Sequence, residues 1–257
     1  MRFKDSKKNK EIFCTLGPST INRNFLKFSN KKVSLLRLNM SHVNINKLDK
    51  TIKFVRKFSR VPICIDTEGA QIRTKVKREK NYKNSEKLTI YKNNGNFKIY
   101  PQEVFNKMKK GDILSIGFDS LKAKIIKKNE KKINCIILNG GKLANNKGVS
   151  VPNRNIKLNF ITEKDKQAIN IAKKMNVNYY ALSFTNSYDD ILKFNKLLRD
   201  KIKIFKIETK AAIQDLNKII SAGDRFLIDR GDLSKELSVE ILPNVQKKIL
   251  KLANLKK

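Results

Sequence analysis

Short apolar segments rich in β-branched residues alternate along the chain with longer segments in which apolar residues recur every three or four positions. The short segments predict buried strands, and the longer ones predict amphipathic helices. Six short segments predict parallel strands, at residues 11–15, 33–38, 61–65, 179–184, 202–207 and 225–228. Four helices are predicted in the second half, at residues 163–175, 188–199, 211–221 and 239–253. This alternation is typical of an α/β fold with a parallel sheet.

The pattern changes between about residues 75 and 151. Short segments of alternating apolar and polar residues there predict antiparallel strands, joined by turns that contain Asn and Gly. We therefore expect an α/β unit with one insertion. Its first part comprises residues 1–74, the inserted β-rich domain residues 75–151, and its second part residues 152–257.

Composition excludes several classes of protein. With 40% hydrophobic residues, a chain of 257 residues can bury a core of its own. The three cysteines, Cys14, Cys64 and Cys135, are too few for a disulfide scaffold or a thiolate zinc cluster. The single histidine, His42, excludes a His-rich zinc site. Since no apolar run approaches a membrane span and the charged N-terminus has no signal-peptide pattern, we expect a cytoplasmic protein without a membrane contact.

The chain carries 58 Lys and Arg against 23 Asp and Glu, a formal net charge of +35. Such a surplus attracts anions, whether phosphorylated metabolites, nucleic acid or acidic lipid. The lysines are scattered through every segment and are not interleaved with aromatic residues, which make up 8% of the chain. This distribution indicates a general compositional bias and does not favour a nucleic-acid partner.

Polar and charged residues follow the predicted parallel strands, where ligands bind in folds of this kind. Two carboxylates, Glu208 and Asp232, can hold Mg²⁺. Arg37 can bind a phosphate through two hydrogen bonds, and Lys206 can place a charge on a transferring phosphoryl group. Oxygen atoms that suit a monovalent cation come from Asn39, Ser41, Asp66 and Thr67. Together these residues predict phosphoryl transfer.

Each of these residues also has a structural explanation when taken alone. Arg37 at the end of a strand can form an ion pair within the fold. Lys206 and Glu208, two positions apart on a strand, can face the same side by chance. The Arg230-Gly231-Asp232 sequence is a common surface turn. Only their joint placement favours the functional interpretation.

The chain is similar to the pyruvate kinase family over nearly its whole length. The similarity lies in ordered motifs, which include CTLGPST, LLRLNMSH, DTEGAQIRT, NGGKLANNKGVSVP, KIFKIETKAAI and AGDRFLIDRGDLSKEL. The resemblance implies a TIM (β/α) barrel with a small β-barrel-like lid domain inserted after the third strand. It also implies a glycolytic transferase that moves the phosphoryl group of phosphoenolpyruvate to ADP, giving ATP, with Mg²⁺ and usually K⁺.

The resemblance also assigns roles to individual residues. Arg37 would contact the transferring phosphate, and Lys206 would stabilise its charge in the transition state. The remaining assignments are Glu208 and Asp232 for Mg²⁺, Asn39, Ser41, Asp66 and Thr67 for K⁺, His42 and Arg73 for the nucleotide phosphates, and Arg230, Gly231 and Asp232 for the substrate carboxylate.

The sequence departs from the family in length, in the motif after the third strand, and around Lys206, where Phe205 replaces a small residue and Ala211 a polar or acidic one. It ends where the family continues with two further barrel strands, the first carrying a threonine implicated in enolate protonation, and a C-terminal regulatory domain, so we expect an incomplete barrel of about six strands. Its open edges predict a homo-oligomer, a second chain that completes the barrel, or edges covered by the chain's own termini. Glu68 stands where the family has lysine. Gln71 stands where the family has an acidic residue or lysine, and this second change leaves the K⁺ dependence open.

Three alternatives to a minimal pyruvate kinase follow. The chain can be a non-catalytic or regulatory relative that binds phosphoenolpyruvate or another phosphorylated metabolite with Mg²⁺. It can have a partial activity, such as enolpyruvate ketonisation or oxaloacetate decarboxylation, which needs the metal and Lys206 but no full ADP site. Nucleic-acid binding through the net positive charge is the least favoured.

Overall fold

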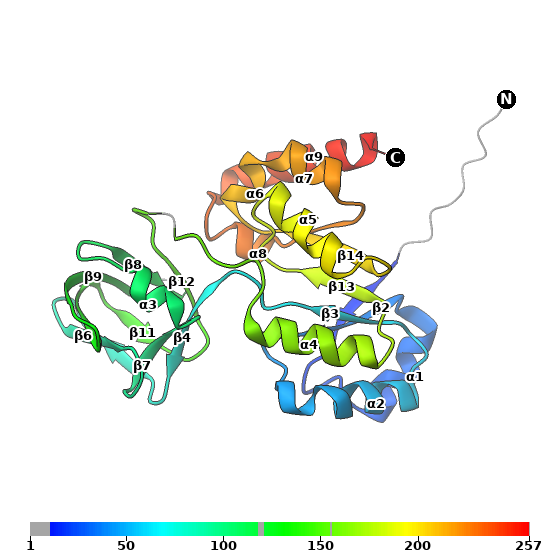
Figure 1. Ribbon diagram of the computed structural model, residues 1–257, viewed down its shortest axis with the longest axis horizontal. Coiled ribbons are helices and arrows are strands. Elements are labelled where there is room, and N and C mark those ends of the chain that lie inside the picture. The colour runs from blue at the N-terminus through cyan, green and yellow to red at the C-terminus, as the bar shows by residue number, and fades with distance from the viewer. Residues whose placement is uncertain (1–10, 118–120, 155, 257) are drawn as a thin grey trace. The chain divides into compact units, whose positions relative to one another are not determined.

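The computed structural model describes residues 11–117, 121–154 and 156–256 (Figure 1). The chain divides into two compact units, the first formed by residues 1–69 and 160–257 and the second by residues 70–159. The second unit is therefore an insertion. The sequence predicted boundaries at residues 75 and 151. The observed unit starts earlier and ends later, so it is longer than expected at both ends.

Six strands form the parallel sheet of the first unit, in the order β1-β2-β3-β13-β14-β15. The strands are β1 (Phe13–Thr15), β2 (Leu35–Asn39), β3 (Ile63–Asp66), β13 (Tyr179–Leu182), β14 (Ile202–Ile207) and β15 (Phe226–Ile228). All six predicted strands are confirmed. Within the described residues β1 and β15 each pair on one side only, so the sheet is an incomplete barrel.

A groove of about 480 Å³ in the first unit touches both edge strands. Its lining combines residues of β1, β15, α8 and α9, namely Phe13, Phe226, Leu227, Ile228, Arg230, Gln246 and Leu250. Exposed apolar side chains contribute to it: Phe13 is 40% exposed and Leu250 is 48% exposed. The expected cover by the N-terminus involves residues 1–10, which lie outside the described residues.

Helices connect the parallel strands, and others follow the last of them, β15 (Figure 1). They are α1 (Arg23–Lys32), α2 (Leu48–Phe58), α4 (Glu163–Lys174), α5 (Tyr188–Leu197), α6 (Lys210–Gln214), α7 (Leu216–Ala222), α8 (Arg230–Leu233) and α9 (Leu242–Leu255), with 3₁₀ turns η1 (Ile45–Lys47) and η2 (Val239–Ile241). The predicted helix 211–221 is divided into α6 and α7 at Asp215, and the predicted helix 239–253 begins as η2.

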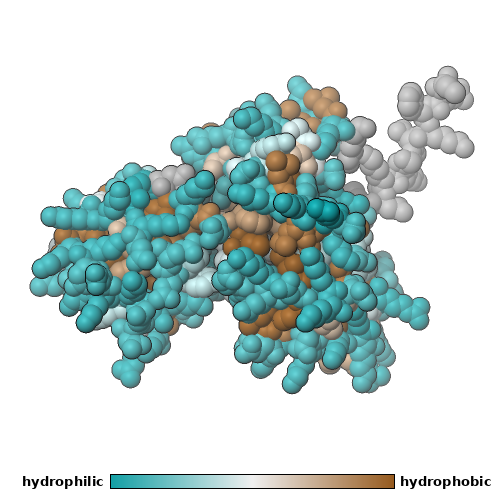
Figure 2. Space-filling view, in the orientation of Figure 1, coloured by the Kyte–Doolittle hydropathy of each residue, from teal (hydrophilic) through white to brown (hydrophobic). Residues whose placement is uncertain are grey.

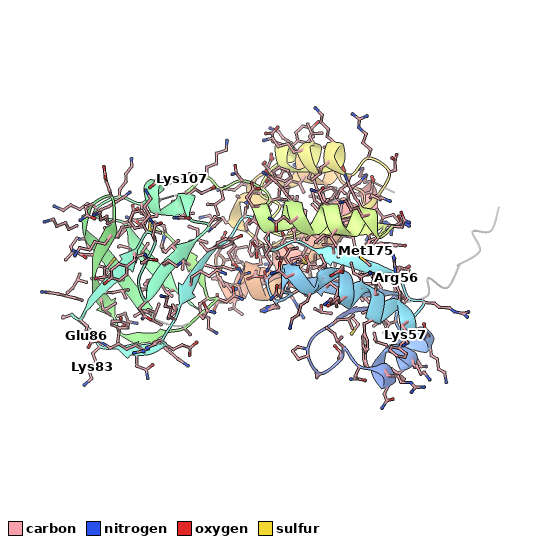
Figure 3. The ribbon with its side chains drawn as sticks, turned by 60° about the horizontal axis from the view of Figure 1, so that its bottom comes forward. Arg56, Lys57, Lys83, Glu86, Lys107 and Met175 are labelled. Atoms are coloured by element: carbon pink, nitrogen blue, oxygen red, sulfur yellow. The ribbon has the colours of Figure 1, made fainter. Side chains whose placement is uncertain are left out.

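Helices α2 and α4 are tied together at their ends. Arg56 on α2 donates to the backbone oxygens of Met175 and Asn176, which follow the last turn of α4 (Figure 3). A cation at this position satisfies carbonyl groups that have no partner within the helix. The contact fixes the C-terminal end of α4, while a capping box fixes its N-terminal end at Thr162 and Asp165.

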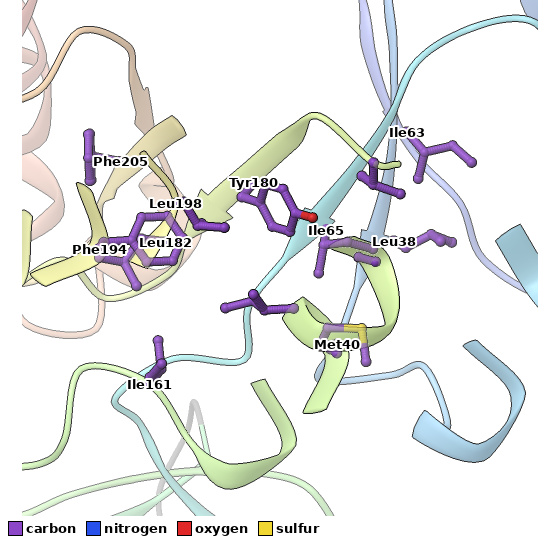
Figure 4. Packing of buried hydrophobic residues seen from close by; sticks show 14 of the residues in the cluster. Leu38, Met40, Ile63, Ile65, Ile161, Tyr180, Leu182, Phe194, Leu198 and Phe205 are labelled. Atoms are coloured by element: carbon purple, nitrogen blue, oxygen red, sulfur yellow. The ribbon is translucent and has the colours of Figure 1, made fainter. Parts of the chain in front are cut away.

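The main core of the first unit lies between the sheet and these helices. It contains Tyr180, Leu182 and Phe205, which point from β13 and β14 toward the helices (Figure 4). The rings of Phe194 on α5 and Phe205 on β14 meet edge to face, with centroids 6.1 Å apart. A smaller cluster, formed by Leu35, Cys64, Ala181 and Ile204, occupies the opposite face of the sheet. The sheet is thus buried on both faces, as parallel sheets are.

The second unit is antiparallel and has its own core. Its main sheet has the order β6-β10-β9-β8-β12-β4-β7, and its end strands β6 and β7 contact each other, so it nearly closes into a barrel. The elements are β4 (Ile72–Val76), β5 (Lys80–Tyr82), β6 (Lys87–Tyr91), β7 (Phe97–Tyr100), α3 (Glu103–Lys107), β8 (Ile113–Ile116), β9 (Leu121–Lys128), β10 (Lys132–Asn139), β11 (Gly141–Leu143) and β12 (Gly148–Ser150). Hydrophilic residues cover most of the face of this unit drawn in Figure 2. Across the described parts of both units, every helix is too short or too polar to cross a membrane.

Candidate active site

The inner face of the parallel sheet changes from apolar to polar along every central strand. Side chains alternate between the two faces of a strand, so positions two apart share a face. The apolar cluster of Leu35, Cys64, Ala181 and Ile204 is followed two residues later on each strand by Arg37, Asp66, Ser183 and Lys206. The strands are staggered, since Arg37 pairs in register with Cys64 and Asp66 with Ala181, but contacts to Asp66 bring the four polar side chains together at the carboxyl end of the sheet.

Lys206 is the centre of this group and is only 4% exposed. Its Nζ lies 2.7 Å from Glu208 Oε1, 3.5 Å from Asp66 Oδ2 and 3.8 Å from Asp229 Oδ2. It also donates a hydrogen bond of 3.1 Å to Ser183 Oγ, which in turn lies 3.0 Å from Asp66 Oδ1. Three carboxylates thus surround one buried ammonium group.

For both Lys206 and Glu208, burial and neighbouring charges shift the pKa in opposite directions. Burial favours the neutral form of Lys206, but the carboxylates of Glu208 and Asp66 outweigh it and raise the pKa of the ammonium group. Burial raises the pKa of Glu208 to about 7, although Lys206 and the backbone N–H of Phe184, which donates to Oε2 at 2.6 Å, oppose this shift. Lys206 therefore stays positive at neutral pH, while Glu208 titrates there.

Arg37, on β2, contacts the same oxygen of Asp66 as Lys206 does. Its Nη2 is 3.0 Å from Asp66 Oδ2, and its side chain is 15% exposed. Its Nε is buried and has no hydrogen-bond partner among the described residues. The ion pair predicted as a structural explanation for Arg37 is present, yet it leaves a buried donor that an incoming anion can satisfy.

A second cluster gathers carboxylates at the same end of the sheet. One oxygen from each of Glu208, Asp229 and Asp232 lies within 4.8 Å of the others. Hard carboxylate oxygens in this number suit Mg²⁺, which keeps its remaining positions for water and phosphate oxygens. The predicted metal residues Glu208 and Asp232 are therefore close together, and a third carboxylate joins them.

Sequence reasoning missed Asp229 and Ser183. Asp229 directly follows β15, and Ser183 directly follows β13, so the rule that ligand-binding residues follow parallel strands applies to both. Asp229 also caps α8, where its Oδ1 accepts a hydrogen bond of 3.4 Å from the backbone N–H of Asp232.

The segment expected to receive a substrate carboxylate forms the start of α8. Arg230, Gly231 and Asp232 make up its first turn, and Lys235 forms an ion pair with Asp232. Space around Gly231 is open on one side, since a Cβ atom there would meet only Asp229 Oδ1, at 3.4 Å. The backbone is thus accessible at this position, and its role in binding stays a prediction.

The residues predicted to hold K⁺ lie on adjacent strand ends. Asn39 and Asp66 are register partners across β2 and β3, and Thr67 follows Asp66. Asn39 Oδ1 accepts from the backbone N–H of Ser41 at 2.9 Å, and Thr67 Oγ1 accepts from that of Ser183 at 3.0 Å. Each of these oxygens keeps a further lone pair for a cation. Their use as K⁺ ligands stays a prediction.

The predicted nucleotide residues belong to different units. His42 is exposed on the turn after β2 in the first unit, whereas Arg73 lies on β4 in the second, where its Nη1 donates to the backbone oxygen of Asn146 at 3.5 Å. Gln71 also belongs to the second unit and lies close to Gly148. Their part in binding ADP or controlling K⁺ dependence stays a prediction.

Glu68, a departure from the family motif, has a structural role. It is 6% exposed, accepts a hydrogen bond of 2.8 Å from Thr162 Oγ1 and lies 3.6 Å from Lys164 Nζ. The next residue, Gly69, has a φ of +67°, and a Cβ there would lie 2.5 Å from the Ser183 carbonyl oxygen. The loop after β3 is therefore held in one conformation beside the site.

Comparisons with known proteins agree with this geometry. The family model described as pyruvate kinase, barrel domain, matches residues 7–257. Pyruvate kinase of Thermotoga maritima is 30% identical over 260 residues, covering 95% of this chain and 56% of the relative, and that of Staphylococcus aureus is 30% identical over 263 residues, covering 95% and 45%. The crystal structure of Cryptosporidium parvum pyruvate kinase superposes with a TM-score of 0.86 at 25% identity, covering 96% of this chain and 56% of that one. The chain thus spans about half the length of the relatives it matches.

Proposed function

Because the chain belongs to the pyruvate kinase family, we propose that it transfers the phosphoryl group of phosphoenolpyruvate to ADP, giving pyruvate and ATP. The observation that carries this proposal is the buried ammonium group of Lys206 beside the carboxylate cluster of Glu208, Asp229 and Asp232. Phosphoryl transfer depends on positioned cations that stabilise developing charge, and this site holds one cation and the ligands for another.

Each residue has a definite task in this proposal. The buried Nε of Arg37 binds a phosphate oxygen, and Lys206 neutralises the phosphoryl group as it moves. Glu208, Asp229 and Asp232 would hold Mg²⁺, which neutralises phosphate charge when bound. The backbone at Arg230, Gly231 and Asp232 receives the substrate carboxylate. Asn39, Ser41, Asp66 and Thr67 bind K⁺, and His42 and Arg73 bind the nucleotide phosphates.

We propose further that the protein works in the cytoplasm and associates with itself through its open sheet edges. Free thiols at Cys14, Cys64 and Cys135 support a reducing compartment. Within the part of the chain that the structure describes, β1 and β15 each pair on one side only, which supports association.

The test measures pyruvate formation from phosphoenolpyruvate and ADP, with Mg²⁺ and K⁺ each present or omitted. We expect turnover that requires Mg²⁺ and that falls by a factor of about 10³ or more in Lys206→Met, because a buried charge-stabilising group is lost. Lys193→Met is the matched control, since Lys193 is 56% exposed on α5 and its change leaves the rate unaltered.

Glu208→Gln separates metal binding from the other functions of the site. We expect it to raise the Mg²⁺ concentration needed for half-maximal rate, while the exposed Glu163→Gln does not. Full turnover in Lys206→Met would contradict the proposal. Mg²⁺-dependent binding of phosphoenolpyruvate without any turnover would instead identify a non-catalytic relative.

A further inference from the structure

A groove of about 510 Å³ on the second unit gathers cations and neutral donors. Its lining, named here the basic groove, is Lys75, Lys92, Asn93, Asn94, Lys98, Ile99, Tyr100 and Gln102. No carboxylate belongs to this lining. Among the residues that the structure describes, the three ammonium groups also form no ion pair with an acidic side chain.

Strand register places two of these lysines against each other. Lys75 on β4 and Lys98 on β7 are direct partners in the antiparallel ladder. Side chains at such positions start about 5 Å apart, and like charges there repel. Lys92 adds a third charge from the turn that joins β6 to β7. The arrangement therefore opposes pairing of the two strands unless an anion neutralises it.

Neighbouring side chains hold the groove in shape. Lys75 Nζ lies 5.0 Å from the centre of the Tyr100 ring, a cation–π distance that positions the ammonium group. Gln102 Nε2 donates a hydrogen bond of 2.7 Å to Asn93 Oδ1, which ties the turn to the chain after β7. The amide groups of Asn93 and Asn94 add neutral donors to the lining.

The abundance of lysine in this chain offers a competing explanation. It can be tested against another lysine pair of the same unit, Lys122 and Lys124 on β9, both of which are exposed. Their register partners are Asn139 and Ile136 on one side and Ser115 and Ile113 on the other, none of them cationic. High lysine content alone therefore does not place cations opposite one another in this sheet.

We propose that the basic groove binds a small anion that carries two or more phosphoryl groups. Three lysines in one lining match several negative charges, and the groove is larger than one phosphate needs. The limited volume of the groove, about 510 Å³, fits a compact ligand better than an extended polymer. The site consists of residues of the second unit alone and is independent of the proposed phosphoryl transfer.

The test titrates inorganic tripolyphosphate into the full chain by calorimetry, in about 150 mM KCl without a divalent metal. We expect Lys75→Ala with Lys98→Ala to weaken binding at least about tenfold, because charged hydrogen bonds are lost. The control, Lys122→Ala with Lys124→Ala, removes the same charge from the same unit and weakens binding less than about twofold. Lys75→Arg with Lys98→Arg keeps the charges and keeps binding.

Equal weakening in both alanine pairs would mean general attraction to a basic protein and would overturn the proposal, as would no binding by the unchanged chain. A single-stranded RNA that bound more tightly than tripolyphosphate, at equal concentrations of phosphate groups, would overturn the choice of a small ligand.

Thermal unfolding without the anion gives a second check. We expect the Lys75 and Lys98 alanine pair to unfold at the same or a higher temperature, since repulsion is relieved. A lower temperature would contradict that repulsion.

Discussion

At the scale of single residues, Glu208 connects burial to the chemistry of the site. Its carboxyl group is buried, and its pKa is raised to about 7. A metal ion must displace the proton that Glu208 holds below this pH. We therefore expect the affinity for Mn²⁺, measured by electron paramagnetic resonance in the absence of substrate, to fall about tenfold per pH unit below 7 and to level off above it.

The affinity for Mn²⁺ falls at low pH because only the ionised carboxylate of Glu208 binds the metal. Ionised Glu208 is the ligand, and its fraction rises with pH until the pKa is passed. Glu208→Gln removes this titration, so its weaker Mn²⁺ binding is expected to vary less between about pH 5.5 and 7. An affinity that is flat across this range in the unchanged protein would contradict the raised pKa of Glu208.

At the scale of elements, the start of α4 anchors the loop after β3. Asp165 is fully buried, and its carboxylate accepts hydrogen bonds from the backbone N–H groups of Glu68, Gly69 and Thr162 at 2.8, 3.1 and 3.0 Å. Asn in its place has one acceptor oxygen and directs an NH₂ group toward an N–H donor. We expect Asp165→Asn to reduce the free energy of unfolding by about 2–4 kcal/mol, measured by urea denaturation.

The capping box of α5 supplies the control for this change. Asp190 accepts from the backbone N–H groups of Asn186 and Ser187 at 2.9 and 3.1 Å but is only partly buried, so water can replace a lost partner. We expect Asp190→Asn to cost about 1 kcal/mol. Equal losses in the two variants would show that the buried loop contacts of Asp165 add nothing to ordinary capping.

Hydrophobic pattern was enough to predict the strands, because short apolar segments rich in β-branched residues favour a buried extended chain. Tertiary contacts decided the rest. The predicted helix 211–221 breaks at Asp215, whose carboxylate accepts from the backbone N–H of Tyr188 at 2.8 Å, at the start of α5. That partner is distant in sequence, so no local pattern announces it. Likewise, Lys206 and Glu208 were predicted from their place at the end of a strand, whereas the approach of Asp229 depends on how β14 and β15 pair.

At the scale of the whole molecule, two features act against each other. The edge strands β1 and β15 expose apolar side chains such as Phe13, which favours association. The formal charge of +35 makes any two copies repel, and this repulsion weakens as salt shortens its range. We therefore expect self-association to increase with ionic strength. An interface held by ion pairs would weaken as ionic strength rises.

Sedimentation velocity at about 50 mM and about 500 mM KCl tests this balance. We expect monomers to predominate at low salt and dimers or larger species at high salt. Phe13→Lys places a charge in the groove beside the edge strands and is expected to abolish association. Val239→Lys adds the same charge at a 67% exposed apolar position outside the groove lining, and is expected to associate as the unchanged protein does. A monomer at both salt concentrations would show that the edges do not drive association, and equal loss in the two variants would assign the effect to net charge alone.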